Sequence, residues 1–193
     1  MADNQIGSYY LATHSDLYEV QRENNFEFIV YDIDNILKAG AIDNPENRIA
    51  NAQQTLRFSM VSSFVPSFSQ EAIPIKRGNS TMKAAGVPTF GEGSISVNDF
   101  IGADTKSALL AWQALSYNVK TEKVGRMSDY KKRCELCEYT PDFTLVRTWV
   151  LEGCWVSAVT QTDYNMEQGG KKTISATIQY DRAYIDYDNT ETA

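Results

Sequence analysis

Alternation between apolar and polar side chains is the clearest pattern in the chain, and it is strongest between residues 144 and 181. There, two β-rich runs flank a polar turn that contains Gly169 and Gly170. In the second run Ile174, Ala176, Ile178 and Tyr180 alternate with Thr173, Ser175, Thr177 and Gln179. Successive side chains of a strand point to opposite faces, so this run predicts a strand with one buried face and one hydroxyl-rich face.

Three further stretches alternate in the same way, and we predict a strand for each. The first, around residues 26–31, sets Phe26, Phe28 and Val30 against Glu27, Ile29 and Tyr31. The second sets Leu56, Phe58 and Met60 against Thr55, Arg57 and Ser59. The third sets Ile95 and Val97 against Ser94, Ser96 and Asn98.

One stretch carries a helical period. Ala108, Ala111, Trp112 and Leu115 recur at the spacing of an amphipathic helix over 104–117, and Asp104 is a suitable N-cap. No second helix of similar quality is visible, so the pattern predicts a mainly β fold with one packing helix. An aromatic side chain on a helical stripe is normally a core anchor. The predicted core anchors are Phe58, Trp112, Leu115, Trp149, Ile174 and Ile178.

Breaks in the pattern divide the chain. We expect residues 1–24 to form a polar arm, 25–185 one domain, and 186–193 an acidic tail. Within the domain, residues 34–54 interrupt the β pattern as an insertion would. Residues 69–91 form a long loop with β character around Ile73 to Ile75.

Composition limits the class of protein. The 193 residues are 42% apolar and fit one domain with a real core, and the formal net charge of -7 argues against binding nucleic acid through its phosphates. The first residues show no secretory signal and no apolar run is long enough to cross a membrane, so we expect folding in a cytoplasm.

The charges are unevenly distributed. Residues 120–133 hold six basic and two acidic residues, whereas residues 1–54 hold nine acids and three bases. A solvated loop explains the basic run taken alone. Oppositely charged patches on one chain also suit self-assembly, in which the basic loop of one copy meets the acidic arm of another.

Candidate chemistry is sparse. Cys134 and Cys137 form a Cys-x-x-Cys pair, but a zinc site would also need Cys154 and His14, without the usual spacing. The surrounding KKRCELCEYTP looks extended, whereas a thioredoxin-like pair begins a helix. A single histidine gives triad catalysis little support, and no phosphate-binding glycine loop is present. We therefore predict no enzyme, metal or cofactor.

The order of these segments resembles a known family, the tail tube proteins of contractile-tailed bacteriophages, which share their fold with the tube protein of type VI secretion. The resemblance covers about residues 25–185. Three motifs are the most specific. The first is Ile73-Pro74 with the basic residues after it, followed by a loop containing Gly and Pro and by the GxxSISV strand at 91–97. The second is the Trp112 helix followed by Tyr130-Lys131-Lys132, and the third is the pair of segments EGCWVSAV (152–159) and ATIQYD (176–181). In the last, Glu152-Gly153 is expected to lead the penultimate turn and Tyr180-Asp181 to close the last strand.

The resemblance implies a tail-tube β-barrel or sandwich that joins neighbouring subunits into a six-fold ring, with rings stacked into a tube. In such a ring the apolar strand faces can pack outward onto the helix, leaving the hydroxyl faces to line the channel. Joined strands also remove exposed sheet edges. The predicted channel-lining residues are Arg57, Ser59, Ser94, Ser96, Asn98, Thr173, Ser175, Thr177 and Gln179. We expect Arg57 to pair with a carboxylate.

Stacking requires a protruding element, and the loop Ser69–Gly91 is our candidate. Four apolar residues in one long loop favour burial in a partner. The predicted stacking residues are Ile73, Ile75, Lys76, Arg77, Met82, Lys83 and Val87. Further expected partners are the tail sheath protein, with the Lys120–Arg133 region and the acidic tail as contacts, the tape-measure protein and genomic DNA in the channel, and baseplate and tail-terminator proteins.

The predicted function is that of a virion structural protein, assembled in the host cytoplasm, whose tube conducts DNA during ejection. Three alternatives stay open. One is a baseplate tube-initiator of the same fold, another is the tube protein of a type VI-like injection system, and the third is a cysteine-based metal or redox module.

Overall fold

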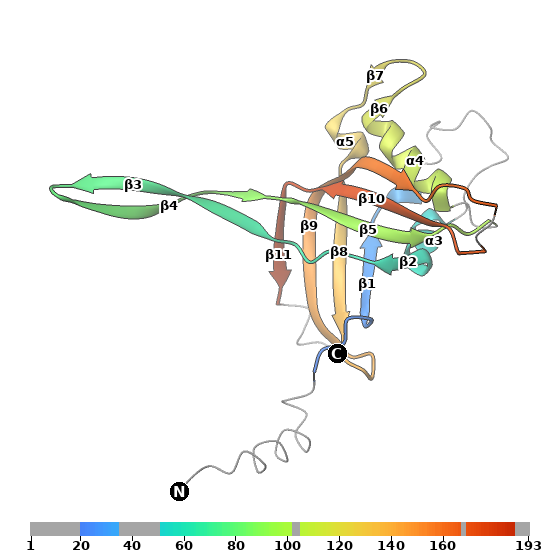
Figure 1. The fold of residues 1–193 in the computed structure, drawn as a ribbon, viewed down its shortest axis with the longest axis horizontal. Helices are drawn as coiled ribbons and strands as arrows, with labels where there is room; N and C mark the ends of the chain where they lie inside the picture. The colour runs from blue at the N-terminus through green and yellow to red at the C-terminus, as the bar shows by residue number, and fades with distance from the viewer. Residues whose placement is uncertain (1–19, 35–50, 102–104, 167–168, 188–193) are drawn as a thin grey trace, which may run out of the picture.

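The computed structural model describes residues 20–34, 51–101, 105–166 and 169–187 (Figure 1). In chain order its elements are β1 (Phe26–Val30), α3 (Ala52–Ser59), β2 (Met60–Ser62), β3 (Phe68–Arg77), β4 (Ser80–Phe90), β5 (Glu92–Asn98), α4 (Thr105–Ser116), β6 (Tyr117–Asn118), β7 (Lys123–Val124), α5 (Met127–Tyr130), β8 (Lys132–Tyr139), β9 (Leu145–Gln161), β10 (Thr173–Gln179) and β11 (Arg182–Asp186).

A seven-stranded antiparallel sheet in the order β1-β8-β9-β10-β5-β2 forms the body, and β11 also pairs with β9. The sheet has two halves, one formed by β1, β8, β9 and β11 and the other by β9, β10, β5 and β2, so β9 belongs to both. Its first part lies between β8 and β11, and residues 155–161 pair with β10. In Figure 1 the β2, β5 and β10 strands run across the direction of β1, β8 and β11. The two halves enclose a common core.

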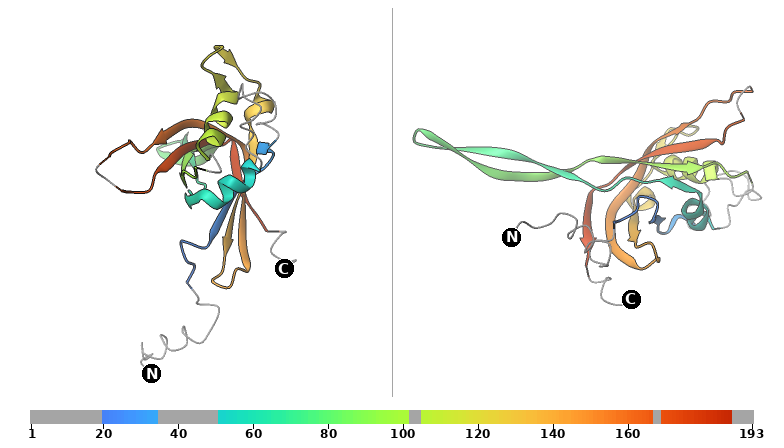
Figure 2. Two further views of the ribbon diagram at one scale, coloured as in Figure 1. Left: turned by 90° about the vertical axis from the view of Figure 1, so that its right-hand side faces the viewer. Right: turned by 60° about the horizontal axis from the view of Figure 1, so that its bottom comes forward.

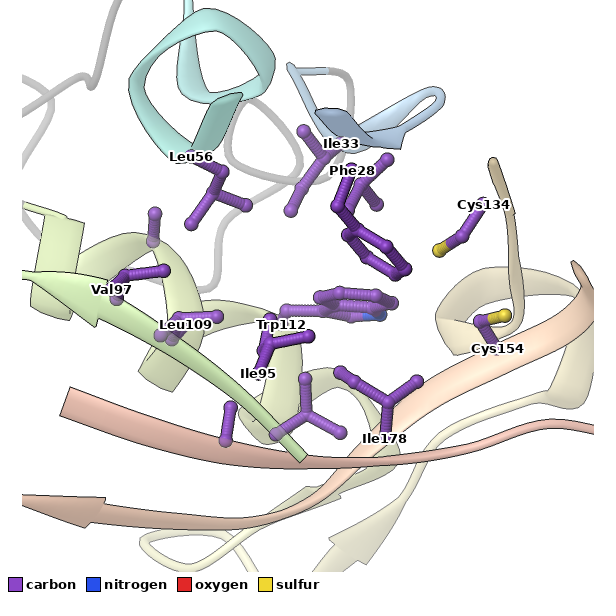
Figure 3. Packing of buried hydrophobic residues seen from close by; sticks show 14 of the residues in the cluster. Phe28, Ile33, Leu56, Ile95, Val97, Leu109, Trp112, Cys134, Cys154 and Ile178 are labelled. Atoms are coloured by element: carbon purple, nitrogen blue, oxygen red, sulfur yellow. The ribbon is translucent and has the colours of Figure 1, made fainter. Parts of the chain in front are cut away.

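The core gathers around Trp112, which lies between Phe28, Ile95, Leu109 and Ile178 in Figure 3. Its indole nitrogen donates a hydrogen bond to the Tyr130 carbonyl oxygen at 2.9 Å, which ties α4 to α5. A buried indole N–H needs such a partner. Helices α3 and α4 contribute Leu56 and Leu109 and so cover the apolar face of the sheet.

The mainly β class is confirmed, and four of the predicted strands and the helix around Trp112 are present. Burial alternates as expected along β10, where Ile174, Ala176 and Ile178 are buried and their neighbours are half-exposed. Of the predicted core anchors, Trp112, Ile174 and Ile178 are fully buried, and Leu115 and Trp149 pack partly buried against the cluster. Asp104, the predicted N-cap, lies outside the described residues.

The strand predicted around residues 55–60 is wrong, because Ala52–Ser59 form helix α3. The buried positions Ala52, Leu56 and Ser59 follow a spacing of four and three, which is the period of a helix and not of a strand. Phe58 was expected in the core but points to solvent, with 75% of its surface exposed. With α3 and the short α5, the described residues hold two more helices than the single one predicted.

The segment predicted as a protruding loop is a two-stranded antiparallel hairpin, β3 and β4, that projects far from the body in Figures 1 and 2. Its positive-φ turn residue is Gly78. Residues 35–50, most of the predicted insertion, lie outside the described residues, as do residues 1–19 of the arm and 188–193 of the tail. The division into arm, domain and tail therefore stays a prediction.

The expected turn at Glu152-Gly153 is also wrong. Gly153 lies inside β9, at the point where its partner changes from β11 to β10, and has a φ of 70°. A Cβ at this position would overlap the Asp181 carboxylate. Tyr180 and Asp181 do not close the last strand but join β10 to β11, and the Asp181 amide donates to the Glu152 carbonyl oxygen at 2.9 Å. The bend thus needs glycine.

Within the described part of the chain, no helix has the length and apolar character needed to cross a membrane.

Candidate assembly surfaces

A hydroxyl-rich face extends over β5, β10 and the end of β9. Ser175 lies opposite Ser96 on one side and Thr160 on the other, and Thr177 lies opposite Ser94. Directly paired residues of antiparallel strands share a face, so these side chains form continuous rows on the side of the sheet opposite the core. At one end of the rows Gln179 donates to the carboxylate of Glu92, the acidic residue of β5. The face therefore offers mainly neutral hydrogen-bonding groups.

Seven of the predicted channel-lining residues come together on this face: Ser94, Ser96, Asn98, Thr173, Ser175, Thr177 and Gln179. Ser59 does not, because it is fully buried in α3 and its hydroxyl donates to the Leu56 carbonyl oxygen at 3.0 Å. Arg57 also lies on α3, away from the hydroxyl rows. Its expected pairing with a carboxylate is confirmed, since the guanidinium binds Glu27 through two nitrogens, one of them at 2.7 Å.

The β3–β4 hairpin has two unlike faces. Ile73 pairs with Ala84 and Ile75 with Met82, which gives one face an apolar strip. Pro74 pairs with Lys83, and Lys76 with Thr81, on the other face. Ile73 and Met82 are 52% and 53% exposed, and Val87 is 83% exposed. A lone two-stranded ribbon is marginally stable in water, so the exposed apolar strip of this projecting ribbon is a candidate contact surface.

A row of aromatic rings fixes the root of the hairpin, and the sequence reasoning missed it. Phe68 and Phe90 face each other across the ribbon with centroids 5.7 Å apart, and Phe90 meets Tyr180 at 6.0 Å. Phe64 stacks on Tyr180 at 5.7 Å and reaches Phe28 in the core at 6.0 Å. The one available signal was that Phe68 and Phe90 bracket the segment. The row connects the core directly to the projecting ribbon.

Two edges of the half-sheet β9-β10-β5-β2 lack a further strand partner within the described part of the chain. Strand β8 pairs with β9 only as far as Cys154, so among the described residues the stretch Trp155–Gln161 has β10 as its only strand partner. At the far side, β2 pairs with β5 through Met60 and Ser62 alone. Such unpaired strand edges are sites where another chain can add a strand.

The predicted basic segment, residues 120–133, includes strand β7 of the small β6–β7 hairpin and helix α5 (Figure 1). Lys123, Arg126 and Met127 are exposed. Lys131 pairs with Asp181 at 2.7 Å and Arg133 with Glu135 at 2.7 Å, so part of the basic run is used within the subunit. Of the other basic residues, Lys123 lies on β7 and Lys132 on β8, opposite Cys154.

The three cysteines are free and buried. As predicted, Cys134 and Cys137 lie on an extended segment, strand β8. Burial raises the pKa of both thiols, and the neighbouring Cys154 raises that of Cys134 further. Because the thiolate is the reactive and metal-binding form, these sites disfavour both chemistries. No group of three or more His, Cys, Asp or Glu within the described ranges is placed to hold a metal ion.

Comparisons with known proteins agree with this geometry. No family model and no curated protein matches the chain. Among solved structures, the fold is similar to a chain of the sheath–tube complex of PVC, an extracellular contractile injection system, with a TM-score of 0.61, 13% identity, and coverage of 93% of this chain and 97% of that one. A chain of the PVC sheath/tube terminator gives a TM-score of 0.60 at 16% identity, covering 89% and 99%. The tube-terminating cap of the anti-feeding prophage gives 0.59 at 12%, covering 86% and 91%. The chain therefore has the tail-tube fold of contractile injection systems.

Proposed function

We propose that this chain is a structural tube protein that assembles into rings, which stack into the inner tube of a contractile injection apparatus. One observation carries the proposal: the half-sheet β9-β10-β5-β2 has its apolar face covered by the helices of its own subunit, a hydroxyl face uncovered, and both edges open. A sheet of this kind satisfies its backbone by joining copies of itself edge to edge.

Joining the open edge of β9 to that of β2 in the next copy closes the sheets into one barrel. Closure removes exposed edges altogether. The helices α3 and α4 then lie outside and the hydroxyl rows of β5 and β10 line the channel. Six copies per ring follow from the resemblance to tail tube proteins. A neutral channel wall in a protein of net charge -7 lacks the cations that would hold phosphate, so DNA could pass without sticking.

The β3–β4 hairpin supplies the contact between stacked rings in this proposal. Its apolar strip, with Ile73, Ile75, Met82 and Val87, covers hydrophobic surface on the adjoining ring, while Lys76, Arg77 and Lys83 meet carboxylates there. The rigid aromatic root at Phe68 and Phe90 holds the ribbon in one direction, which a repeating contact requires.

The partners follow from this role. A sheath would surround the helices and the β6–β7 hairpin, and baseplate and terminator proteins would close the two ends of the tube. In a phage, a tape-measure protein and then genomic DNA would occupy the channel, and the chain would be a virion tail component assembled in the host cytoplasm. The chain itself would turn over no substrate and bind no cofactor.

A role confined to a single ring is the second candidate. The terminator and cap chains match nearly as well as the tube chain, with TM-scores of 0.60 and 0.59 against 0.61, and a chain of the anti-feeding prophage baseplate gives 0.54. An initiator or terminator would share the ring geometry but would not polymerise.

Negative-stain electron microscopy across a protein concentration series tests both roles. Stacked rings with a central channel are expected for a tube protein, and single rings at every concentration would favour an end-of-tube role. A monomer at all concentrations would contradict ring assembly.

A further inference from the structure

A groove lined by both apolar and polar side chains runs beside the edge of β9. It has a volume of about 690 Å³ and lies between α4, the start of the β6–β7 hairpin and the strand itself. Leu110, Tyr117 and Val119 line it and are 38%, 46% and 81% exposed. Trp155 forms part of its wall, and Gln113 fixes α4 to this strand by donating to the Ser157 carbonyl oxygen at 3.1 Å.

An apolar ridge lies at the opposite edge of the same half-sheet. Phe58, at the end of α3, is 75% exposed and forms this ridge. Val61 and Val65, in and after β2, are 39% and 62% exposed and line a hollow beside β1 and β8. Phe58 lies on the side of α3 opposite Leu56 and Ser59, which face the core. Nothing within its own subunit covers this ring in the described structure, although a Phe ring is among the most costly side chains to leave in water.

The groove and the ridge lie in the same layer of the molecule. Helices α3 and α4 both pack on the apolar side of the sheet. Helix α3 leads directly into β2 and contacts β1, β5 and α4, and α4 lies over β9. If the β2 edge of one copy is placed along the β9 edge of the next, the end of α3 reaches the side where α4 and the β6–β7 hairpin stand. The geometry therefore brings Phe58 of one copy toward the groove of its neighbour.

Charge complementarity favours the same arrangement. On the ridge side, Glu23 borders a surface hollow that also includes Val61, and Glu27 in the same hollow is already paired with Arg57. The groove is flanked by the basic segment, with Lys120 in its lining and Lys123 on β7. Opposite charges at the rim of an interface fix its register and speed association.

We propose that Phe58 is the hydrophobic anchor of the contact between neighbouring subunits within a ring, and that it docks into the groove lined by Leu110, Tyr117 and Trp155 of the next copy. This inference rests on the proposed ring assembly and names the side chains that hold it together. The occupant of the groove is a second copy of this chain. The contact is head to tail, because ridge and groove lie on opposite edges, and such contacts close into rings or extend into filaments.

The first test compares two exposed phenylalanines. Phe58→Asp is expected to abolish rings in electron micrographs. In sedimentation velocity, the protein concentration at which half of the chains are assembled should rise at least tenfold over that of the wild type. Phe143→Asp is the control, since Phe143 is 78% exposed at the turn between β8 and β9. Both variants should melt as cooperatively as the wild type, because neither ring is part of the core.

The second test reads the contact directly. Protein carrying Phe58→Cys is mixed with protein carrying Tyr117→Cys, assembled, and treated with a short bismaleimide. A cross-linked dimer in the mixture, and none with either variant alone, is the expected result.

The outcomes separate the inference from the proposed function. Rings formed by both wild type and Phe58→Asp would overturn the Phe58 anchor and leave the tube proposal intact. Cross-linking with Phe58→Cys alone would overturn the head-to-tail contact in favour of a symmetric one. Absence of wild-type rings under all conditions would overturn the proposed function, and the anchor with it.

Discussion

The hydroxyl of Tyr180 donates a hydrogen bond to the Ser67 carbonyl oxygen at 3.0 Å and accepts one from the Ser67 amide at 3.1 Å. Tyr180 immediately follows β10, and Ser67 immediately precedes the projecting hairpin. This reciprocal bond, together with the stacking of Phe64 on Tyr180, clamps the root of the hairpin to the body of the subunit.

Tyr180→Phe should therefore lower the free energy of unfolding by about 1 kcal/mol, because it removes both bonds but keeps the ring in the core. Guanidinium unfolding monitored by circular dichroism measures the change. Tyr184→Phe is the matched control, since the Tyr184 hydroxyl reaches Glu152 only at 3.4 Å on an exposed strand. A control effect as large as that of Tyr180→Phe would show that the clamp contributes nothing of its own.

Gly93 provides a second test of the same root. A Cβ at residue 93 would overlap the ring of Phe64, whereas a Cβ at Gly91 would meet no atom within 4 Å. Gly93→Ala is expected to cost about 1–3 kcal/mol, as overpacking does, and Gly91→Ala to leave stability nearly unchanged. Thermal melting curves of the two variants and the wild type measure the difference in stability. Equal midpoints would mean that Phe64 has room to move.

Tyr31 predicts a loss of stability in alkali. Burial and the hydrogen bond that its hydroxyl donates to Glu135 at 2.7 Å raise the pKa of Tyr31 from 10.0 to about 12. The folded state thus favours the neutral phenol, so this stabilisation is complete below pH 10 and is lost as the pH rises from 10 to about 12. The difference in unfolding free energy between wild type and Tyr31→Phe should shrink over that range. A difference that stays constant would contradict the assignment.

If the hairpin makes the contact between rings, a change in its apolar strip should block the stacking of rings without blocking ring formation. Ile75→Asp places a charge in the apolar strip and should leave single rings but no tubes in electron micrographs, because a charge buried against a neighbour without a partner is costly. Thr81→Asp changes an exposed residue on the opposite face of the ribbon and should still allow tubes. Tubes formed by both variants would remove the hairpin from the stacking contact.

If the hydroxyl face lines the channel, a cysteine on this face should become inaccessible to a bulky reagent when tubes form. A cysteine at Thr177 should react with a bulky polyethylene-glycol maleimide in the monomer and become inaccessible in the assembled tube. A cysteine at Phe143, at the turn between β8 and β9, should remain reactive in both states when no sheath is present. Gel shifts report the labelling. Equal labelling of Thr177→Cys in monomer and tube would place this face outside the channel.

Several features could be predicted from the sequence because they depend on local periodicity. The alternation in β10 gave both its buried face and its hydroxyl face, and the stripe through Trp112 gave the position of α4. The pairing of Arg57 with a carboxylate was also expected, because Arg57 was placed as the one cation among channel-lining hydroxyls; the pairing is present, although Arg57 lies on α3. The same reasoning failed for α3, where Leu56 and Phe58 alternate by chance within a helix and Met60 already belongs to β2.

The sequence by itself thus determined the class of the fold, the two-faced strands and the uneven distribution of charge, because each follows from neighbouring residues along the chain. Only the tertiary structure decided that Gly153 bends a strand, that Phe64, Tyr180 and Phe90 form one aromatic row, and that Phe58 and the Tyr117 groove lie at opposite edges of one sheet. These relationships join residues far apart in the chain. They depend on strand order and register, which many residues set together and no local pattern encodes.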